Sequence, residues 1–240
     1  MKPKRALGQN FFINKNLGDH IINTLVKSNS KGVLEIGPGL GFFTERLIKV
    51  FNDLIVVEKD NALAKNLQLL FPNIRVINED FLDLELDTFK DITYFGSLPY
   101  NVSKPIIKKI IQSNTFKNPA YFIIQKEVAE KYIYIRPYNI LSLTTAIYAD
   151  VKKLLDISPS SFKPQPNVES SLVVFYPKKE IFGKYAELEK LITMAFKQPR
   201  KTLKNNLKGT KYINLEGFES ARAEELSLDN YISILLNNSC

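Results

Sequence analysis

The chain has 240 residues, and 45% of them are hydrophobic, so it is long enough and apolar enough to fold as a globular protein. Its 33 Lys and Arg residues outnumber its 25 Asp and Glu residues, and the net charge of +8 favours partners that carry phosphate groups. A single histidine and a single cysteine exclude a disulfide framework, a histidine-based triad and a zinc cluster, so we expect no metal site.

The first informative segment joins a short apolar run at residues 33–36 to three glycines at alternate positions, Gly37, Gly39 and Gly41. Apolar residues with helical spacing follow at 42–48, so the segment predicts a buried strand, a tight turn and a helix. Glycines suit such a turn because the backbone can bend sharply and a ligand can approach it without meeting a Cβ atom. A plain structural turn would have the same glycines, so the loop alone is weak evidence for a ligand.

A second apolar run at residues 54–57 ends in Glu58. In doubly wound folds, an acid about twenty residues beyond the first glycine binds ribose hydroxyls, so this spacing indicates a bound nucleoside. The pattern G-x-G-x-G differs from the G-x-G-x-x-G of dinucleotide-binding proteins. Glu35, beside the loop, also suits a cationic sulfonium amino acid better than a pyrophosphate. We therefore expect S-adenosylmethionine as the cofactor in preference to a dinucleotide.

The remaining segments predict a two-part chain. Residues 1–178 alternate strands and helices, as expected of a doubly wound, Rossmann-like α/β domain, and residues 179–240 have helical spacing without a strand signal. The later strands are expected at 92–95, 120–125 and 172–176, and the helices of the small C-terminal domain at 185–196, 200–207 and 228–236.

One tetrapeptide, Ser97-Leu98-Pro99-Tyr100, resembles the N-L-P-Y motif of the KsgA-type small-subunit rRNA adenine dimethyltransferases, which are related to the Erm-type rRNA methyltransferases. The resemblance extends over nearly the whole chain. Beyond the glycine loop, it includes residues 7–11, 78–81, 96–103, 125–129, 162–170 and 196–205. It implies a class I S-adenosylmethionine-dependent enzyme that dimethylates N6 of two adjacent adenosines in a hairpin near the 3′ end of small-subunit (16S) rRNA.

The chemistry of this reaction explains the tetrapeptide. The lone pair of an adenine N6 amine is delocalised into the ring, and acceptors that bind the amine hydrogens localise it on nitrogen for attack on a methyl group. We expect one acceptor from the carbonyl exposed by the Leu98-Pro99 turn and one from Ser97, where the family usually has Asn. Tyr100 would stack on the extruded base. Phe162 resembles the aromatic residue that faces it, although it could equally be a core residue.

The resemblance also assigns cofactor contacts. Asp80 resembles the acid that binds the adenine amine of the cofactor, with Phe81 beside it, although Asp80 could instead be a helix cap. Gln9 and Asn10 resemble a pair that closes over the cofactor, although they could form a solvated arm. The complete set expected at the cofactor is Gln9, Asn10, Phe11, Glu35, Gly37, Gly39, Gly41, Glu58, Lys59, Asp80, Phe81 and Ser97.

Two basic segments without acidic residues indicate where RNA would bind. One is at the start of the chain and the other at residues 196–211, and both could instead be ordinary solvated surfaces. We expect them to flank the active cleft of a monomer whose partner is small-subunit rRNA within the ribosomal subunit or its precursor. The residues expected to contact RNA are Lys4, Arg5, Lys197, Arg200, Lys201 and Lys204.

The sequence indicates neither a membrane segment nor a signal peptide. No window is long and apolar enough to span a bilayer. Gln9 and Asn10 interrupt any apolar core near the start of the chain. We therefore expect a cytoplasmic protein.

Two alternatives remain open. An Erm-type enzyme would act on large-subunit rRNA with the same chemistry, although Pro105 and the segment 162–170 favour the small-subunit group. A non-catalytic ribosome-assembly factor or organellar transcription factor could use the same fold, and Ser97 is the feature that favours it. The glycine loop, Glu58 and Asp80 argue against loss of cofactor binding.

Overall fold

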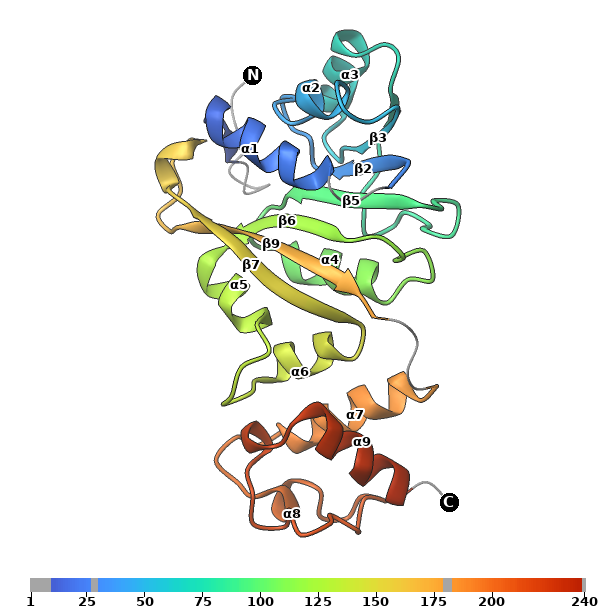
Figure 1. Ribbon diagram of the computed structural model, residues 1–240, viewed down its shortest axis with the longest axis vertical. Coiled ribbons are helices and arrows are strands. Elements are labelled where there is room, and N and C mark those ends of the chain that lie inside the picture. The colour runs from blue at the N-terminus through green and yellow to red at the C-terminus, as the bar shows by residue number, and fades with distance from the viewer. Residues whose placement is uncertain (1–9, 27–29, 179–182, 239–240) are drawn as a thin grey trace. The chain divides into compact units, whose positions relative to one another are not determined.

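The computed structural model describes residues 10–26, 30–178 and 183–238 (Figure 1). Contacts divide the chain into two compact units. The first contains the residues up to Glu130 together with Lys152–Pro177, and the second contains Lys131–Val151 together with the residues from Lys178 onward. The sequence analysis expected one boundary, after residue 178, and placed Lys131–Val151 in the first domain, whereas contacts group Lys131–Val151 with the second unit.

The first unit is built on a twisted sheet with strand order β4-β3-β2-β5-β6-β9-β7. The strands from β4 to β6 are parallel to their neighbours, and β9 is antiparallel to β6. Every strand expected from the sequence is present, and the Rossmann-like prediction is confirmed. The strands are β2 (Gly32–Ile36), β3 (Asp53–Val57), β4 (Arg75–Ile77), β5 (Ile92–Ser97), β6 (Ala120–Gln125), β7 (Ala149–Ile157) and β9 (Ser170–Pro177).

Both faces of this sheet are buried, which explains why its central strands are nearly continuous apolar runs. Val33, Phe95 and Ile123 belong to one core cluster, and the register of β2, β5 and β6 places their side chains on the same face of the sheet. The intervening residues Tyr94 and Phe122 point to the opposite face and are equally inaccessible to solvent. Side chains alternate between the two faces along each strand, and in the central strands the side chains on both faces are mostly apolar.

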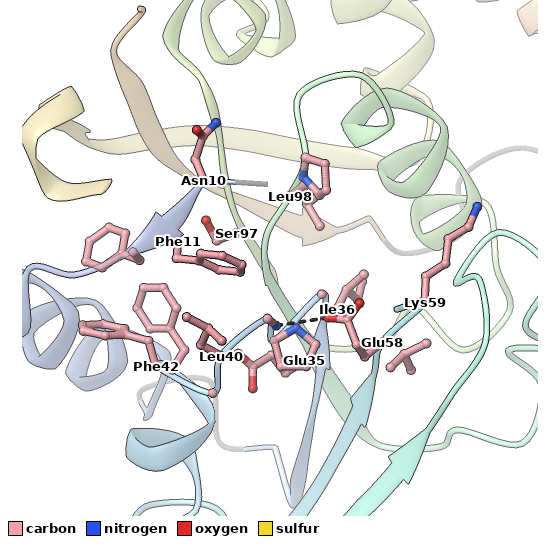
Figure 2. A pocket seen from close by; sticks show the side chains of 18 of the residues that line it. Asn10, Phe11, Glu35, Ile36, Leu40, Phe42, Glu58, Lys59, Ser97 and Leu98 are labelled. Carbon is pink, nitrogen blue, oxygen red and sulfur yellow. Dashed lines mark hydrogen bonds between the residues drawn. The ribbon is translucent and has the colours of Figure 1, made fainter. Parts of the chain in front are cut away.

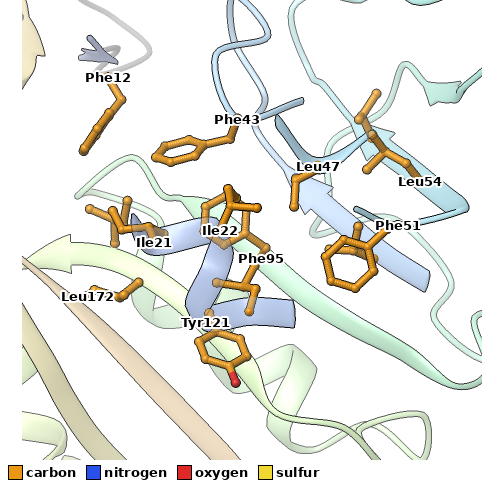
Figure 3. Packing of buried hydrophobic residues seen from close by; sticks show 14 of the residues in the cluster. Phe12, Ile21, Ile22, Phe43, Leu47, Phe51, Leu54, Phe95, Tyr121 and Leu172 are labelled. Atoms are coloured by element: carbon orange, nitrogen blue, oxygen red, sulfur yellow. The ribbon is translucent and has the colours of Figure 1, made fainter. Parts of the chain in front are cut away.

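Helix α1 (Lys15–Leu25) covers the first face, where Ile21 and Ile22 join the same core cluster (Figure 3). It begins where Asn14 caps it by accepting a hydrogen bond from the Leu17 amide at 3.1 Å. The helix expected at 42–48 is restricted to α2 (Thr44–Leu47), because the chain is still turning up to residue 43. The other helices of this unit are α3 (Asn61–Leu70), α4 (Ser103–Ile111) and α5 (Lys126–Tyr132), of which the last crosses into the second unit.

A two-stranded ribbon that the sequence did not indicate lies beside the sheet. Strand β1 (Phe11–Phe12) pairs antiparallel with β8 (Phe162–Lys163), which follows a short 3₁₀ turn at Pro159–Ser161. The Phe12 and Phe162 rings meet edge to face, with centroids 5.1 Å apart. The ribbon therefore joins the start of the described chain to a segment about 150 residues away, and both segments become walls of the same cavity.

The second unit is a small helical domain with a core of its own. Its helices are α6 (Ile140–Ala146), α7 (Tyr185–Ala195), α8 (Leu203–Asn206) and α9 (Leu228–Asn237). Leu143 and Ile147 pack in one cluster with Leu191 and Ile234, which explains why Lys131–Val151 group with this unit. Helix α8 is shorter than the expected 200–207. Within the described ranges, no helix combines the length and the apolar character needed to cross a bilayer.

Candidate active site

A cavity of about 830 Å³ opens in the first unit at the carboxyl ends of β2, β3 and β5. The strand order reverses there, because β3 and β4 lie on one side of β2 and β5 and β6 lie on the other. Open α/β sheets bind their ligands at such a point. The cavity brings together every expected cofactor-binding and catalytic residue that lies in the described ranges. Figure 2 labels seven of them, which are Asn10, Phe11, Glu35, Glu58, Lys59, Ser97 and Leu98.

The glycine loop lies between β2 and α2 with its backbone in a conformation that only glycine adopts easily. Gly37, Gly39 and Gly41 have φ values of 66°, 60° and 85°. A Cβ atom on Gly39 would lie 3.0 Å from the ring of Phe11, whereas one on Gly37 would have no neighbour within 4 Å. The loop is therefore packed against Phe11 at Gly39 and has open space beside Gly37.

Glu58, at the end of β3, is buried and holds the glycine loop. One carboxylate oxygen accepts a hydrogen bond from the Gly39 amide at 3.1 Å, and the other accepts one from the Asp60 amide at 2.8 Å. Burial raises the pKa of Glu58, and these two hydrogen bonds oppose the rise. Each carboxylate oxygen has a further lone pair, so the group can still accept hydrogen bonds from ribose hydroxyls.

Glu35 lies in β2 below the loop and is 2% exposed. Its carboxyl group accepts a hydrogen bond of 2.6 Å from the hydroxyl of Thr44, at the start of α2. Burial raises the pKa of Glu35 to about 8, so the group is mostly protonated at pH 7. The negative charge that we expected beside the loop is therefore largely absent at pH 7. Thr44, which the sequence analysis did not identify, is the residue that fixes this carboxyl group.

Asp80 follows β4 and forms an ion pair with Lys59, with 2.5 Å between Oδ2 and Nζ. Its other oxygen accepts a hydrogen bond of 3.0 Å from the Leu82 amide. Asp80 therefore caps a turn, whereas the alternative role in the sequence analysis was the cap of a helix. The hydrogen bond from Lys59 is the main reason that the pKa of Asp80 is lowered. Both partners of the ion pair line the cavity, as does the buried Phe81.

The segment Ser97-Leu98-Pro99-Tyr100 begins at the last residue of β5 and leads into α4. The Leu98 amide donates to the Ile123 carbonyl at 3.0 Å, and the Pro99 carbonyl accepts from the Val102 amide at 3.1 Å. Among the described residues, no hydrogen bond engages the Leu98 carbonyl or the Ser97 hydroxyl. These two oxygens are therefore available as acceptors at the carboxyl end of β5.

The two aromatic residues expected at the target base have different surroundings. Tyr100 is half-buried, and its hydroxyl lies 2.7 Å from the Ser170 hydroxyl. Phe162 lines the cavity but is 4% exposed and packs against Phe12, so it is a member of the core as well as a wall of the site. Ser170 lies 70 residues away from Tyr100 in sequence, and no local signal could have identified this contact.

Three expected residues lie outside the described part of the chain, and four others lie in the second unit. Lys4, Arg5 and Gln9 lie outside the described residues, whereas Asn10 lines the cavity. The other basic residues expected at RNA, Lys197, Arg200, Lys201 and Lys204, are exposed in the second unit, and no ion pair involves them in the described part of the chain. Within the same ranges, no three His, Cys, Asp or Glu side chains gather as metal ligands.

The chain was compared with families of known proteins and with individual relatives. The family model for ribosomal RNA adenine dimethylase matches residues 1–235. The chain is 33% identical to ribosomal RNA small subunit methyltransferase A of Chlorobium luteolum, over 94% of this chain and 86% of the relative. It is 36% identical to the protein of the same name from Wigglesworthia glossinidia brevipalpis, over 98% and 97% of the two chains.

Solved structures share the fold. A dimethyladenosine transferase from Plasmodium falciparum matches with a TM-score of 0.82 and 24% identity, over 95% of this chain and 96% of the other. The 23S rRNA methyltransferase ErmE matches with a TM-score of 0.75 and 22% identity, over 95% and 98% of the chains. The family match over residues 1–235, together with these relatives, shows that the chain is a member of the ribosomal RNA adenine dimethylase family.

Proposed function

We propose that this enzyme uses S-adenosylmethionine to dimethylate N6 of adenosine in small-subunit rRNA. We further propose that the target is two adjacent adenosines in a hairpin near the 3′ end. One observation carries the proposal: the glycine loop and the Ser97–Tyr100 segment line a single cavity, so a cofactor site and an acceptor for an amine are adjacent. Membership of the dimethylase family and the names of the curated relatives support it.

The residues of the cavity fit S-adenosylmethionine. The open space beside Gly37 leaves room for a ligand close to the backbone, and a cavity of about 830 Å³ is at the upper end of the range for small-molecule sites. Glu58 would hold the ribose hydroxyls, and Asp80 would hold the adenine amine. Asn10 and the following Phe11 of β1 would close over the methionine part. When bound, the cofactor supplies an activated methyl group.

The chain's own residues prepare the acceptor. The Leu98 carbonyl and the Ser97 hydroxyl accept hydrogen bonds from the adenine N6 amine and localise its lone pair on nitrogen. Tyr100 provides the aromatic surface on which the extruded base stacks. The amine proton leaves to water after the transfer. The serine hydroxyl is shorter than the amide of asparagine but retains the accepting oxygen.

The RNA partner is proposed from charge and from the relatives. The exposed residues Lys197, Arg200, Lys201 and Lys204 would contact the phosphate backbone in a salt-dependent manner. The curated relatives described above are named for the small subunit, which favours this subunit over the large one. The monomeric state and the cytoplasmic location stay predictions.

The test is methyl transfer to isolated ribosomal subunits. Small and large subunits from cells that lack this methylation are incubated with the protein and methyl-labelled S-adenosylmethionine, and their RNA is analysed by mass spectrometry. Dimethyladenosine in small-subunit RNA is the expected result. Label in large-subunit RNA would contradict the proposed substrate and favour the Erm-type alternative. No transfer to either subunit, with cofactor binding verified by calorimetry, would favour the non-catalytic alternative.

A further inference from the structure

Tyr100 is held at the far end of its ring by a residue from a different part of the chain. Its hydroxyl lies 2.7 Å from the hydroxyl of Ser170, and Ser170 is completely buried. Burial raises the pKa of Tyr100, a hydroxyl that already carries its proton at neutral pH. Both hydroxyls are therefore protonated and able to share a hydrogen bond at the pH at which the enzyme would work.

Ser170 is itself fixed by its neighbours. The carboxylate of Glu169 lies 2.8 Å from Nζ of Lys126, and the Ser171 hydroxyl donates to Asp156 at 2.6 Å. Lys126 and Asp156 also form an ion pair at 3.1 Å. Successive side chains of a strand point to opposite faces. The residues on either side of Ser170 are thus bound to one ionic cluster, and Ser170 points the other way, to Tyr100.

The other end of Tyr100 is held through its backbone. The Ser103 hydroxyl donates to the Tyr100 carbonyl at 3.3 Å, and the preceding Leu98 amide is bound to Ile123 of β6. A tyrosine side chain has only two rotatable bonds, so fixing its backbone and its hydroxyl together leaves the ring one orientation. The ring then requires no ordering when a base binds, and the entropic cost of stacking falls.

We propose that Ser170 is a positioning residue, which holds the Tyr100 ring as a fixed aromatic wall of the cavity on which the target adenine stacks. The proposal rests on the proposed function, because the base is the adenine to be methylated. It assigns a role to the start of β9, which the sequence resemblance included without a function.

The first experiment compares four variants with the wild type in methyl transfer: Tyr100→Phe, Ser170→Ala, the double variant, and Ser171→Ala. Ser171 is the matched control, because it is an equally buried serine one residue away that points to the opposite face. Without the Ser171 hydroxyl, Asp156 keeps its ion pairs with Lys126 and Lys153, so the cluster beside Ser170 stays in place. Loss of one hydrogen bond is expected to lower kcat about fivefold in Tyr100→Phe and in Ser170→Ala. The double variant is expected to be no slower than either single variant, and KM for the cofactor is expected to stay the same.

Additive losses in the double variant would overturn the proposal, and so would an equal loss of kcat in Ser171→Ala. If Ser170→Ala fails to fold in a thermal melt, Tyr100→Phe still removes the hydrogen bond from the other side. Its kcat alone then decides: a loss of about fivefold supports the proposal, and wild-type kcat overturns it.

A second measurement separates this proposal from the proposed function. NMR relaxation of ¹³C-labelled tyrosine rings reports ring mobility without substrate, and the Tyr100 signal is identified by its absence in Tyr100→Phe. The ring is expected to gain mobility in Ser170→Ala and not in Ser171→Ala. Unchanged mobility of the Tyr100 ring in Ser170→Ala would overturn the role of Ser170. A mobile ring in Ser170→Ala, with no methyl transfer by the wild type, would support the anchoring role and contradict the proposed function instead.

Discussion

Glu58 and Gly39 are joined by a hydrogen bond of 3.1 Å from the Gly39 amide to the Glu58 carboxylate. The acid that ends β3 thus holds the loop that follows β2, and both line the cavity. One side chain therefore combines two tasks, because it shapes the loop and is placed to accept hydrogen bonds from a bound ribose. Its removal affects both at once.

Glu58→Ala is expected to weaken S-adenosylmethionine binding about 10- to 100-fold, since hydrogen bonds to a charged group contribute about 1.5–3 kcal/mol each. Isothermal titration calorimetry measures the Kd. Glu85→Ala is the control, because it removes the same charge from an exposed position outside the cavity. Equal affinities of the two variants would show that Glu58 does not hold the cofactor.

Glu35 makes the stability of the fold depend on pH. Its pKa is about 8 in the folded protein and 4.5 in its ordinary state, so the folded chain keeps a proton that the unfolded chain loses. The free energy of unfolding should therefore fall as pH rises from 4.5 to about 8, by on the order of a few kcal/mol. Glu35→Gln keeps the size and shape of the side chain but has no group that titrates, so the free energy of unfolding of this variant should vary less with pH.

Urea unfolding at pH 5, 6, 7 and 8, on wild type and Glu35→Gln, provides the comparison for Glu35. Other ionisable groups contribute the same slope to both proteins, so the difference between the two curves isolates Glu35. Parallel curves would mean that the carboxyl group is ionised in the folded protein at neutral pH.

Ser97→Ala should lower kcat about 10²- to 10³-fold, since it removes one of the two acceptors proposed for the adenine amine. Cofactor affinity should change little, because in the described part of the chain no hydrogen bond links the Ser97 side chain to the glycine loop or to Glu58. Ser97→Asn is the matched variant, because it supplies an amide oxygen at the same position, and it should remain active. Single-turnover methyl transfer measures the step directly. Full activity of Ser97→Ala would remove the side chain from the reaction.

Replacement of Arg200, Lys201 and Lys204 together should weaken RNA binding and flatten its salt dependence. Each lost phosphate contact lowers the slope of log K against log salt by about 0.9, so three contacts change it by about 3. Replacement of Lys65, Lys90 and Lys117, which are exposed in the first unit, changes the net charge equally and is the control. The same slope in both triple variants would show that the second-unit residues are an ordinary solvated surface.

The sequence predicted the parts of the site that local pattern determines. The strand, loop and helix around Gly37, the acid at Glu58 and the segment from Ser97 to Tyr100 all lie in one cavity, as expected from elements whose order places strand ends together. Residue types at fixed offsets carry this information, because strands and turns follow from neighbouring residues.

The parts that the sequence missed depend on contacts between distant segments. The pairing of Phe11 with Lys163 joins two short strands, and a two-residue strand has too little periodicity to be recognised. The grouping of Leu143 with Leu191 is a matter of packing between helices, which amphipathic spacing alone does not specify. The protonation of Glu35 follows from its complete burial, and burial is a property of the folded chain.

The β1–β8 ribbon has a consequence for shortened forms of the protein. Phe11 is adjacent to the glycine loop at Gly39, yet the strand that it begins is hydrogen-bonded to the strand that contains Phe162. Deletion of residues 1–12 would expose one edge of β8 and remove the ring on which Phe162 packs. A truncation that removes Phe11 beside the glycine loop would therefore also disturb the wall that contains Phe162, so residues 10–12 are part of the cavity and not a separate appendage.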